Sequence, residues 1–279
     1  MSYAAEISRT NPSCFVFLID QSGSMADRCG AGESKRSKAQ GIADAINKLL
    51  QNLVIKCAKS DGIRDYYHVA VIGYGAQVGS AFTGPLSGRD LVPISEIADR
   101  PARIEERRKK ADDGAGGLIE ESVKFPVWFD PAASGGTPMC EALARAQALL
   151  AAWLNEHPSC FPPVVIHLTD GEATDGDPTV PAEALRALAS NDGEVLLFNG
   201  HVSSHRASPI EFPDAEDTLP DEYARLLFRM SSFLPDHIRA FAQQEGYNVS
   251  PNTRGFTFNA DFVAVIRFLD IGTRPANLR

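Results

Sequence analysis

The segment CFVFLIDQSGS, residues 14–24, joins a near-continuous apolar run to an aspartate and a loop of small hydroxyl residues. Such a run is typical of a strand that is buried on both faces, as in a parallel sheet covered by helices. Similar apolar runs follow at 68–75 (HVAVIGYG), 163–170 (PVVIHLTD) and 194–202 (EVLLFNGHV). We expect these segments to form the central strands of one sheet.

Stretches with the periodicity of amphipathic helices lie between the apolar runs. Residues 37–56 and 139–153 place apolar side chains at spacings of three and four, and Pro138 suits the first position of the second helix. A third helix is expected to open at Pro181, and Asn259 is expected to cap a fourth. This alternation predicts an α/β fold, a Rossmann-like open and mostly parallel sheet with helices on both faces.

The composition favours a single domain over residues 1–279, with a core at about 13–272. Of its 279 residues, 44% are hydrophobic and 23% are charged, and no linker-like tract divides them. Segments 81–124 and 205–255 interrupt the alternation, and we interpret them as insertions at the rim of the sheet. The first contains the charge run RIEERRKKADD, which we interpret as a solvated helical face.

The charge and the N-terminal segment narrow the class of protein. A net charge of -9 argues against a surface for nucleic acid or for an anionic membrane. The N-terminal sequence MSYAAEISRTNPS has neither a basic start nor an apolar run of signal length, and no apolar stretch is long enough to span a membrane. The cysteines are odd in number and widely spaced, which favours reduced thiols. We expect a cytoplasmic protein.

Oxygen-bearing side chains follow two of the predicted strands. Asp20, Ser22 and Ser24 come directly after the first strand, and Asp170 ends the strand at 163–170. Thr137, in the turn SGGTP, can reach the same edge, where open α/β sheets place their ligands. Carboxylates and hydroxyls suit Mg²⁺, and Mn²⁺ or Ca²⁺ would also accept them. Taken singly these residues could be helix caps, Thr137 above all.

Together, in this order, the residues resemble the metal-ion-dependent adhesion site (MIDAS) of the von Willebrand factor A-type (VWA) domain family. The DxSxS signature is similar to Asp20, Ser22 and Ser24, the glycine-rich threonine loop to GGTP with Thr137, and the distal aspartate to Asp170 in LTDGEATDG. The resemblance covers nearly the whole chain. It implies that the three hydroxyls bind the cation directly, that both aspartates act largely through water, and that a partner's Glu or Asp completes the shell.

The resemblance also carries expectations about the rest of the molecule. It implies one antiparallel edge strand, for which Val78 to Phe82 is the best candidate. Standalone bacterial cytoplasmic members of the family suggest partners such as an AAA+ ATPase, or a kinase and phosphatase pair in signalling and stress response. No nucleic-acid or membrane partner and no catalysis are expected. The function implied is metal-dependent protein binding.

Several other interpretations fit the residues less well. The glycine-rich segment 30–37 lacks the glycine that should precede the lysine of a phosphate-binding loop. A phosphohydrolase of the haloacid dehalogenase class would need an acid where Ser22 stands. His201 and His205 have no third zinc ligand nearby, and His167 is expected to be a buried, hydrogen-bonded imidazole. A structural subunit, in which the metal only stabilises the loops, is the main alternative to the binding module.

Overall fold

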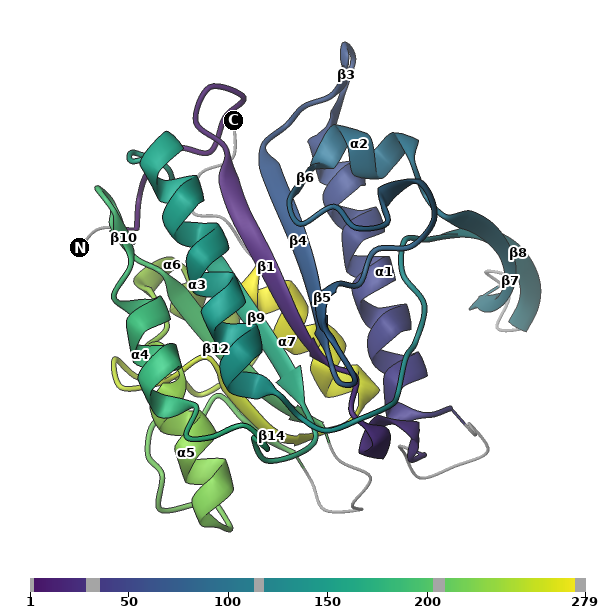
Figure 1. Ribbon diagram of the computed structural model, residues 1–279. Coiled ribbons are helices and arrows are strands. Elements are labelled where there is room, and N and C mark those ends of the chain that lie inside the picture. The colour runs from purple at the N-terminus through teal and green to yellow at the C-terminus, as the bar shows by residue number, and fades with distance from the viewer. Residues whose placement is uncertain (1–2, 29–35, 113–117, 203–208, 274–279) are drawn as a thin grey trace.

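The computed structural model describes residues 3–28, 36–112, 118–202 and 209–273. At its centre is a sheet with the order β13-β14-β12-β9-β1-β4-β5, and β6 also pairs with β4 (Figure 1). The neighbours from β14 to β4 are parallel. The strands are β1 (Ser13–Asp20), β4 (Tyr67–Tyr74), β5 (Val78–Ser80), β6 (Val92–Pro93), β9 (Val164–Thr169), β12 (Leu196–Val202), β13 (Ile210–Glu211) and β14 (Phe256–Ala260).

The predicted fold class, an open and mostly parallel α/β sheet, is confirmed. Each predicted central strand is present, and β14 joins them as a further parallel strand that the sequence pattern did not reveal. The predicted edge strand is β5, which runs antiparallel to β4. Two short strands are additional: β6 is also antiparallel to β4, and β13 is antiparallel to β14 at the opposite edge.

Helices cover both faces of the sheet. In Figure 1, α3 crosses in front of the strands and α7 lies behind them. Along β1, Phe15 and Phe17 belong to the core on one face, whereas Val16 and Leu18 belong to the core on the other. Burial on both faces explains why the run has no polar alternation. One face is covered by α1 (Lys38–Cys57), α2 (Ile94–Asp99), α6 (Asp236–Gln244) and α7 (Phe262–Gly272), the other by α3 (Met139–Glu156), α4 (Thr179–Arg186) and α5 (Glu222–Met230).

Two predicted helix starts are wrong, and a third is displaced by one residue. Helix α4 begins at Thr179 rather than at Pro181. Asn259 lies in β14 with φ 55°, a left-handed conformation that asparagine tolerates, and Asp261 caps α7 by accepting a hydrogen bond from the N–H of Ala264 at 2.9 Å. Helix α3 begins at Met139, with Pro138 in the cap position. Local cap chemistry does not distinguish acceptors that lie two residues apart.

The prediction that the charge run is helical is wrong. It forms β7 (Arg103–Asp112), which pairs antiparallel with β8 (Leu118–Val127) in a hairpin that projects from the body (Figure 1). The guanidinium of Arg107 lies 3.6 Å from the ring centroid of Phe125 across the hairpin. A partner strand downstream therefore decides the conformation, which the mixed charges alone do not.

The predicted insertions carry elements of their own. Segment 81–124 contains the turn η2 (Gly84–Leu86), β6, α2, β7 and the start of β8, and segment 205–255 contains β13, α5 and α6. Small ladders β2 (Ala58–Lys59) with β3 (Gly62–Ile63) and β10 (Ala189–Ser190) with β11 (Gly193–Glu194) lie outside the main sheet. No helix within the described ranges is long and apolar enough to cross a bilayer. The division into one domain with two insertions stays a prediction.

Candidate metal centre

The carboxyl ends of β1 and β9 lie side by side at the point where the sheet changes direction. The chain leaves β1 through α1 toward β4, whereas it leaves β9 through α4 toward β12 on the other side. The two following loops diverge at such a switch point and leave a crevice for a ligand. Asp20 is the last residue of β1, and Asp170 directly follows β9.

Asp20 is fully buried, and its carboxylate holds the first loop by hydrogen bonds. One carboxylate oxygen accepts a hydrogen bond from the N–H of Ser22 at 2.8 Å. The other accepts from the hydroxyl of Thr169 at 2.8 Å. Burial raises the pKa of Asp20, while the hydrogen bonds from Ser22 and Thr169 act in the opposite direction. The carboxylate is thus tied to both loops at once.

The serine hydroxyls form a row that links the two loops. Ser22 Oγ lies 3.1 Å from Ser24 Oγ, and Ser24 Oγ donates to Asp170 Oδ1 at 2.7 Å. The turn η1 (Gly23–Ala26) places them there, since Ser22 is its N-cap residue. Ser22 is buried and Ser24 is exposed. Four of the five predicted residues therefore form one hydrogen-bonded group.

Thr137 arrives on a separate loop that packs against the first. The N–H of Gly23 donates to the carbonyl of Gly135 at 3.1 Å, and Gly135 has φ 81° with no room for a side chain. The N–H of Thr137 donates to Thr174 Oγ1 at 3.0 Å. Thr137 Oγ1 would lie 3.8 Å from a Cβ placed on Gly171, just after Asp170. In the described parts of the chain no hydrogen bond to that hydroxyl occurs, so it is available to a ligand.

Lys38 is a member of the group that sequence reasoning missed. Its Nζ lies 2.7 Å from Asp170 Oδ2 and 3.9 Å from Asp27 Oδ2. The side chains of Lys38 and Asp170 are 7% and 0% exposed. Lys38 is the first residue of α1, where the helix dipole disfavours a cation. That unusual position was the one signal in the sequence that could have pointed to it.

A second buried polar group lies in the sheet beside the candidate site. Tyr74, the register partner of Asp20, shares a hydrogen bond between its hydroxyl and His167 Nε2. His167 Nδ1 lies 2.8 Å from Asn199 Oδ1, which fixes the neutral tautomer with the proton on Nδ1. Burial lowers the pKa of His167 to about 4. The prediction of a buried, hydrogen-bonded imidazole is confirmed.

The donor set fits a hard divalent cation. It consists of carboxylate and hydroxyl oxygens, the ligands that Mg²⁺ and Ca²⁺ prefer. Among the residues placed by the structure, no group of three His, Cys, Asp or Glu side chains could hold a metal ion. A metal ion at this place would therefore need the hydroxyls of Ser22, Ser24 and Thr137, which are hard ligands. The role of these residues as ligands stays a prediction.

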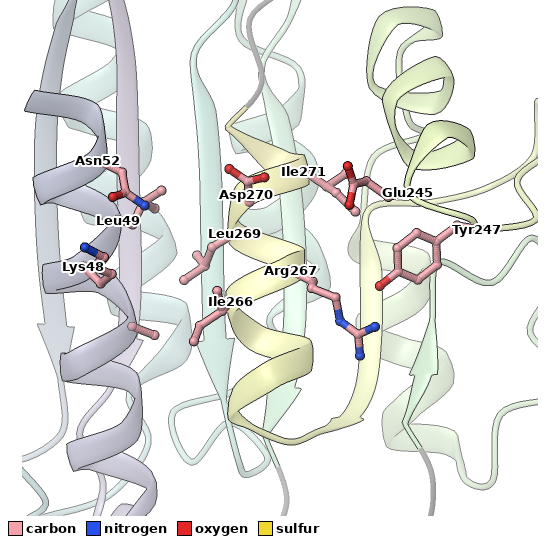
Figure 2. A pocket seen from close by; sticks show the side chains of 11 residues that line it. Lys48, Leu49, Asn52, Glu245, Tyr247, Ile266, Arg267, Leu269, Asp270 and Ile271 are labelled. Carbon is pink, nitrogen blue, oxygen red and sulfur yellow. The ribbon is translucent and has the colours of Figure 1, made fainter. Parts of the chain in front are cut away.

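Several hollows lined by described residues lie outside this group, and two of them are next to α1 or to the candidate site. One of about 380 Å³, lined by Glu172 and Tyr223 among others, is directly beside the candidate site, where the Tyr223 hydroxyl donates to the carbonyl of Gly171. The other, of about 310 Å³, lies between α1 and α7, and none of the predicted metal residues lines it. Figure 2 shows Ile266 and Leu269 of α7 facing the helix that carries Leu49.

The structure describes only part of the histidine pair His201 and His205 and of the glycine-rich segment 30–37. The ring of His201 stacks on Phe258 with centroids 4.4 Å apart, as a structural side chain would. His205 lies outside the described residues, as does most of the glycine-rich segment 30–37. Arg28 and Ser37 form an antiparallel bridge just before the start of α1.

No family model and no curated protein matches the sequence. Similar solved structures include a von Willebrand factor type A protein from Catenulispora acidiphila, with 20% identity, a TM-score of 0.39 and coverage of 69% of this chain and 34% of that one. The vWF domain of the pili tip protein Mfa5 from Porphyromonas gingivalis has 15% identity and a TM-score of 0.33, with coverage of 58% of this chain and 39% of that one. The ArnB paralog VWA2 from Sulfolobus acidocaldarius has 14% identity and a TM-score of 0.35, with coverage of 69% of this chain and 35% of that one. The chain thus spans between 34% and 39% of the length of these three solved chains.

Proposed function

We propose that this protein is a divalent-metal-dependent protein-binding module. In this proposal Ser22, Ser24 and Thr137 hold Mg²⁺ directly, while Asp20 and Asp170 hold it through water. A glutamate or aspartate of a partner protein completes the coordination shell. The protein would act by capture and release of that partner rather than by catalysis, in a bacterial signalling, stress-response or ATPase-associated assembly.

The observation that carries the proposal is the convergence of the three loops at the switch point of the sheet. Ser24 joins the first loop to Asp170 at 2.7 Å, and Gly23 joins it to Gly135 of the threonine loop at 3.1 Å. These contacts bring hydroxyls from loops more than a hundred residues apart to one edge. Open α/β sheets bind ligands at this edge.

The balance of charge favours capture of an acidic group. Hydroxyls are neutral ligands, so a cation held mainly by them keeps most of its positive charge. Its remaining coordination position attracts a carboxylate more strongly than it would if several carboxylates bound it directly. Since the chain carries a net charge of -9, the ion would also provide a local positive point on an acidic surface.

Isothermal titration with Mg²⁺ tests the metal site. We expect the wild-type protein to bind one equivalent and Ser24→Ala to lose at least about tenfold in affinity, since a direct ligand is removed. Ser159→Ala is the matched control, because Ser159 is an exposed serine before the amino end of β9, at the opposite edge. Equal affinities for the wild type and Ser24→Ala would contradict the assigned ligands.

Affinity capture from a host extract separates the binding module from the structural alternative. Recovery of a partner that requires Mg²⁺, and fails with EDTA or with Ser24→Ala, is the outcome we expect. If the metal only stabilises the loops, EDTA should lower the melting temperature and leave partner recovery unchanged at temperatures where the protein stays folded. That second result would exclude the proposed role of the ion in binding.

A further inference from the structure

We infer that Lys38 is a resident counter-cation of the proposed metal centre and lowers its affinity for a divalent ion. The inference rests on the proposed function, because it concerns the same site. The Nζ of Lys38 is held 2.7 Å from Asp170 Oδ2, in a pair whose side chains are 7% and 0% exposed. At such burial a fixed charge acts on its neighbours with little screening by solvent.

Every carboxylate oxygen in the group already has a partner from the chain itself. Asp20 accepts from the N–H of Ser22 and the hydroxyl of Thr169, each at 2.8 Å. Asp170 accepts from Ser24 at 2.7 Å and from Lys38 at 2.7 Å. The ammonium thus compensates one of the two carboxylate charges, so an incoming divalent ion meets a net charge of about -1 rather than -2.

The position of Lys38 indicates a role beyond that of an ordinary ion pair. A cation at the first residue of a helix faces unpaired N–H groups of the same sign, which costs stability. The backbone nevertheless holds the residue there: the N–H of Lys38 donates to the carbonyl of Asp27 at 2.9 Å, and Ser37 caps the helix by accepting from the N–H of Gln40 at 3.2 Å. These contacts direct the side chain to Asp170.

Two carboxylates lie near the Lys38 ammonium, and they interact with it to different extents. Asp170 is close, and Asp27 is 3.9 Å away with a side chain that is 68% exposed and therefore well screened by water. The strong interaction is with the proposed metal residue. Removal of the positive charge should leave Asp170 as a buried anion that only a metal ion can compensate.

Titration of Lys38 variants with Mg²⁺ alone tests the inference. We expect Lys38→Gln, whose amide can still donate to Asp170, to bind Mg²⁺ at least about tenfold more tightly than the wild type. Lys38→Arg should stay near the wild type because it keeps the charge. Lys56→Met is the control, since Lys56 lies on the same helix in a 3.8 Å pair with Asp270, away from the site.

Thermal shift provides a second readout that does not depend on a partner. Saturating Mg²⁺ should raise the melting temperature of Lys38→Gln by more than that of the wild type, since the ion replaces the missing compensation. Unchanged or weaker Mg²⁺ binding by folded Lys38→Gln would overturn the inference and would make the pair purely structural. If the wild type binds no Mg²⁺, the proposed function fails, and the inference is then decided by Lys38→Gln alone: binding supports it and no binding overturns it.

Discussion

At the scale of single residues, Asp20 and Gly135 set the geometry of the site. Asp20 has no exposed surface, yet both of its oxygens are hydrogen-bonded, to Ser22 and to Thr169. Gly135 has φ 81°, and a Cβ added there would lie 2.5 Å from the backbone nitrogen of Ala76. One residue ties two loops together, and the other lets the third loop approach them. The first role needs both acceptor oxygens of the carboxylate, and the second needs the absence of a side chain.

Replacement of Asp20 by asparagine should weaken both folding and metal binding. The amide oxygen can still accept from Ser22, but the NH₂ group can no longer accept from Thr169, whose hydroxyl then keeps only the carbonyl of Gly171, at 3.0 Å, as its acceptor. We expect a loss of about 1 kcal/mol in the free energy of unfolding, measured by urea denaturation, because one hydrogen bond to the carboxylate is lost, and a loss of Mg²⁺ binding by calorimetry. Asp217→Asn, at an exposed aspartate, is the control and should change neither quantity.

Replacement of Gly135 by alanine should displace the threonine loop. Gly88→Ala is a well-matched control, because Gly88 has φ 76° and no atom within 4 Å of an added Cβ. Both variants bear the cost of a positive φ, about 1 kcal/mol, and only Gly135→Ala adds a clash with the backbone. We expect Gly135→Ala alone to lose Mg²⁺ affinity in calorimetry. Similar Mg²⁺ binding by the two variants would show that the loop position is unimportant.

At the scale of elements, the hairpin of β7 and β8 shows how a distant partner determines secondary structure. Arg107 packs on Phe125 across the hairpin and also pairs with Asp44 of α1 at 2.9 Å. Gln51 of α1 donates to the carbonyl of Lys124. These contacts hold the base of the hairpin against α1 and so fix the direction in which β7 and β8 project from the main sheet.

Loss of the Arg107 side chain should loosen the contact of the hairpin with α1. Its side chain is 28% exposed, so the cation–π contact and the ion pairs with Asp44 and Glu105 together are worth about 1 kcal/mol after screening by solvent. In Arg107→Ala we expect faster amide hydrogen exchange across β7 and β8, with exchange in β1 unchanged. Ser122→Ala, at an exposed position of β8, is the control and should leave exchange in the hairpin close to that of the wild type.

At the scale of the whole molecule, a network of hydrogen-bonded polar side chains crosses the buried strands of the sheet. His167 on β9 links Tyr74 on β4 to Asn199 on β12, and Asn199 continues to Ser231 at the end of α5 at 2.9 Å. Four elements therefore share one hydrogen-bonded network, which is stable only while the imidazole is neutral. Its protonation state contributes to the stability of the entire fold.

The stability should fall in mild acid because of His167. Its pKa is about 4 in the folded protein and about 6.5 in the unfolded chain, so the unfolded state binds more protons between these values. The contribution of about 3 kcal/mol is present above pH 6.5 and is lost as the pH falls toward 4. In His167→Gln, urea denaturation between pH 7 and pH 4.5 should show a shallower decline. Parallel curves would contradict this assignment.

The sequence by itself determined the central strands, the two long helices and the order in which the oxygen-bearing residues follow the strands. Apolar runs and helical spacings are local patterns, so they predicted β1, β4, β9 and β12 without knowledge of the fold. The parallel sheet then required Asp20 and Asp170 to meet at one edge.

Only the tertiary structure decided the features that depend on distant partners. Lys38 and Asp170 are 132 positions apart, and their buried pair cannot be inferred from either neighbourhood. The hairpin and β14 likewise need a partner strand before their residues prefer extended backbone over helix. The physical reason is that strand pairing and buried charge compensation are properties of two segments, whereas a sequence pattern describes one.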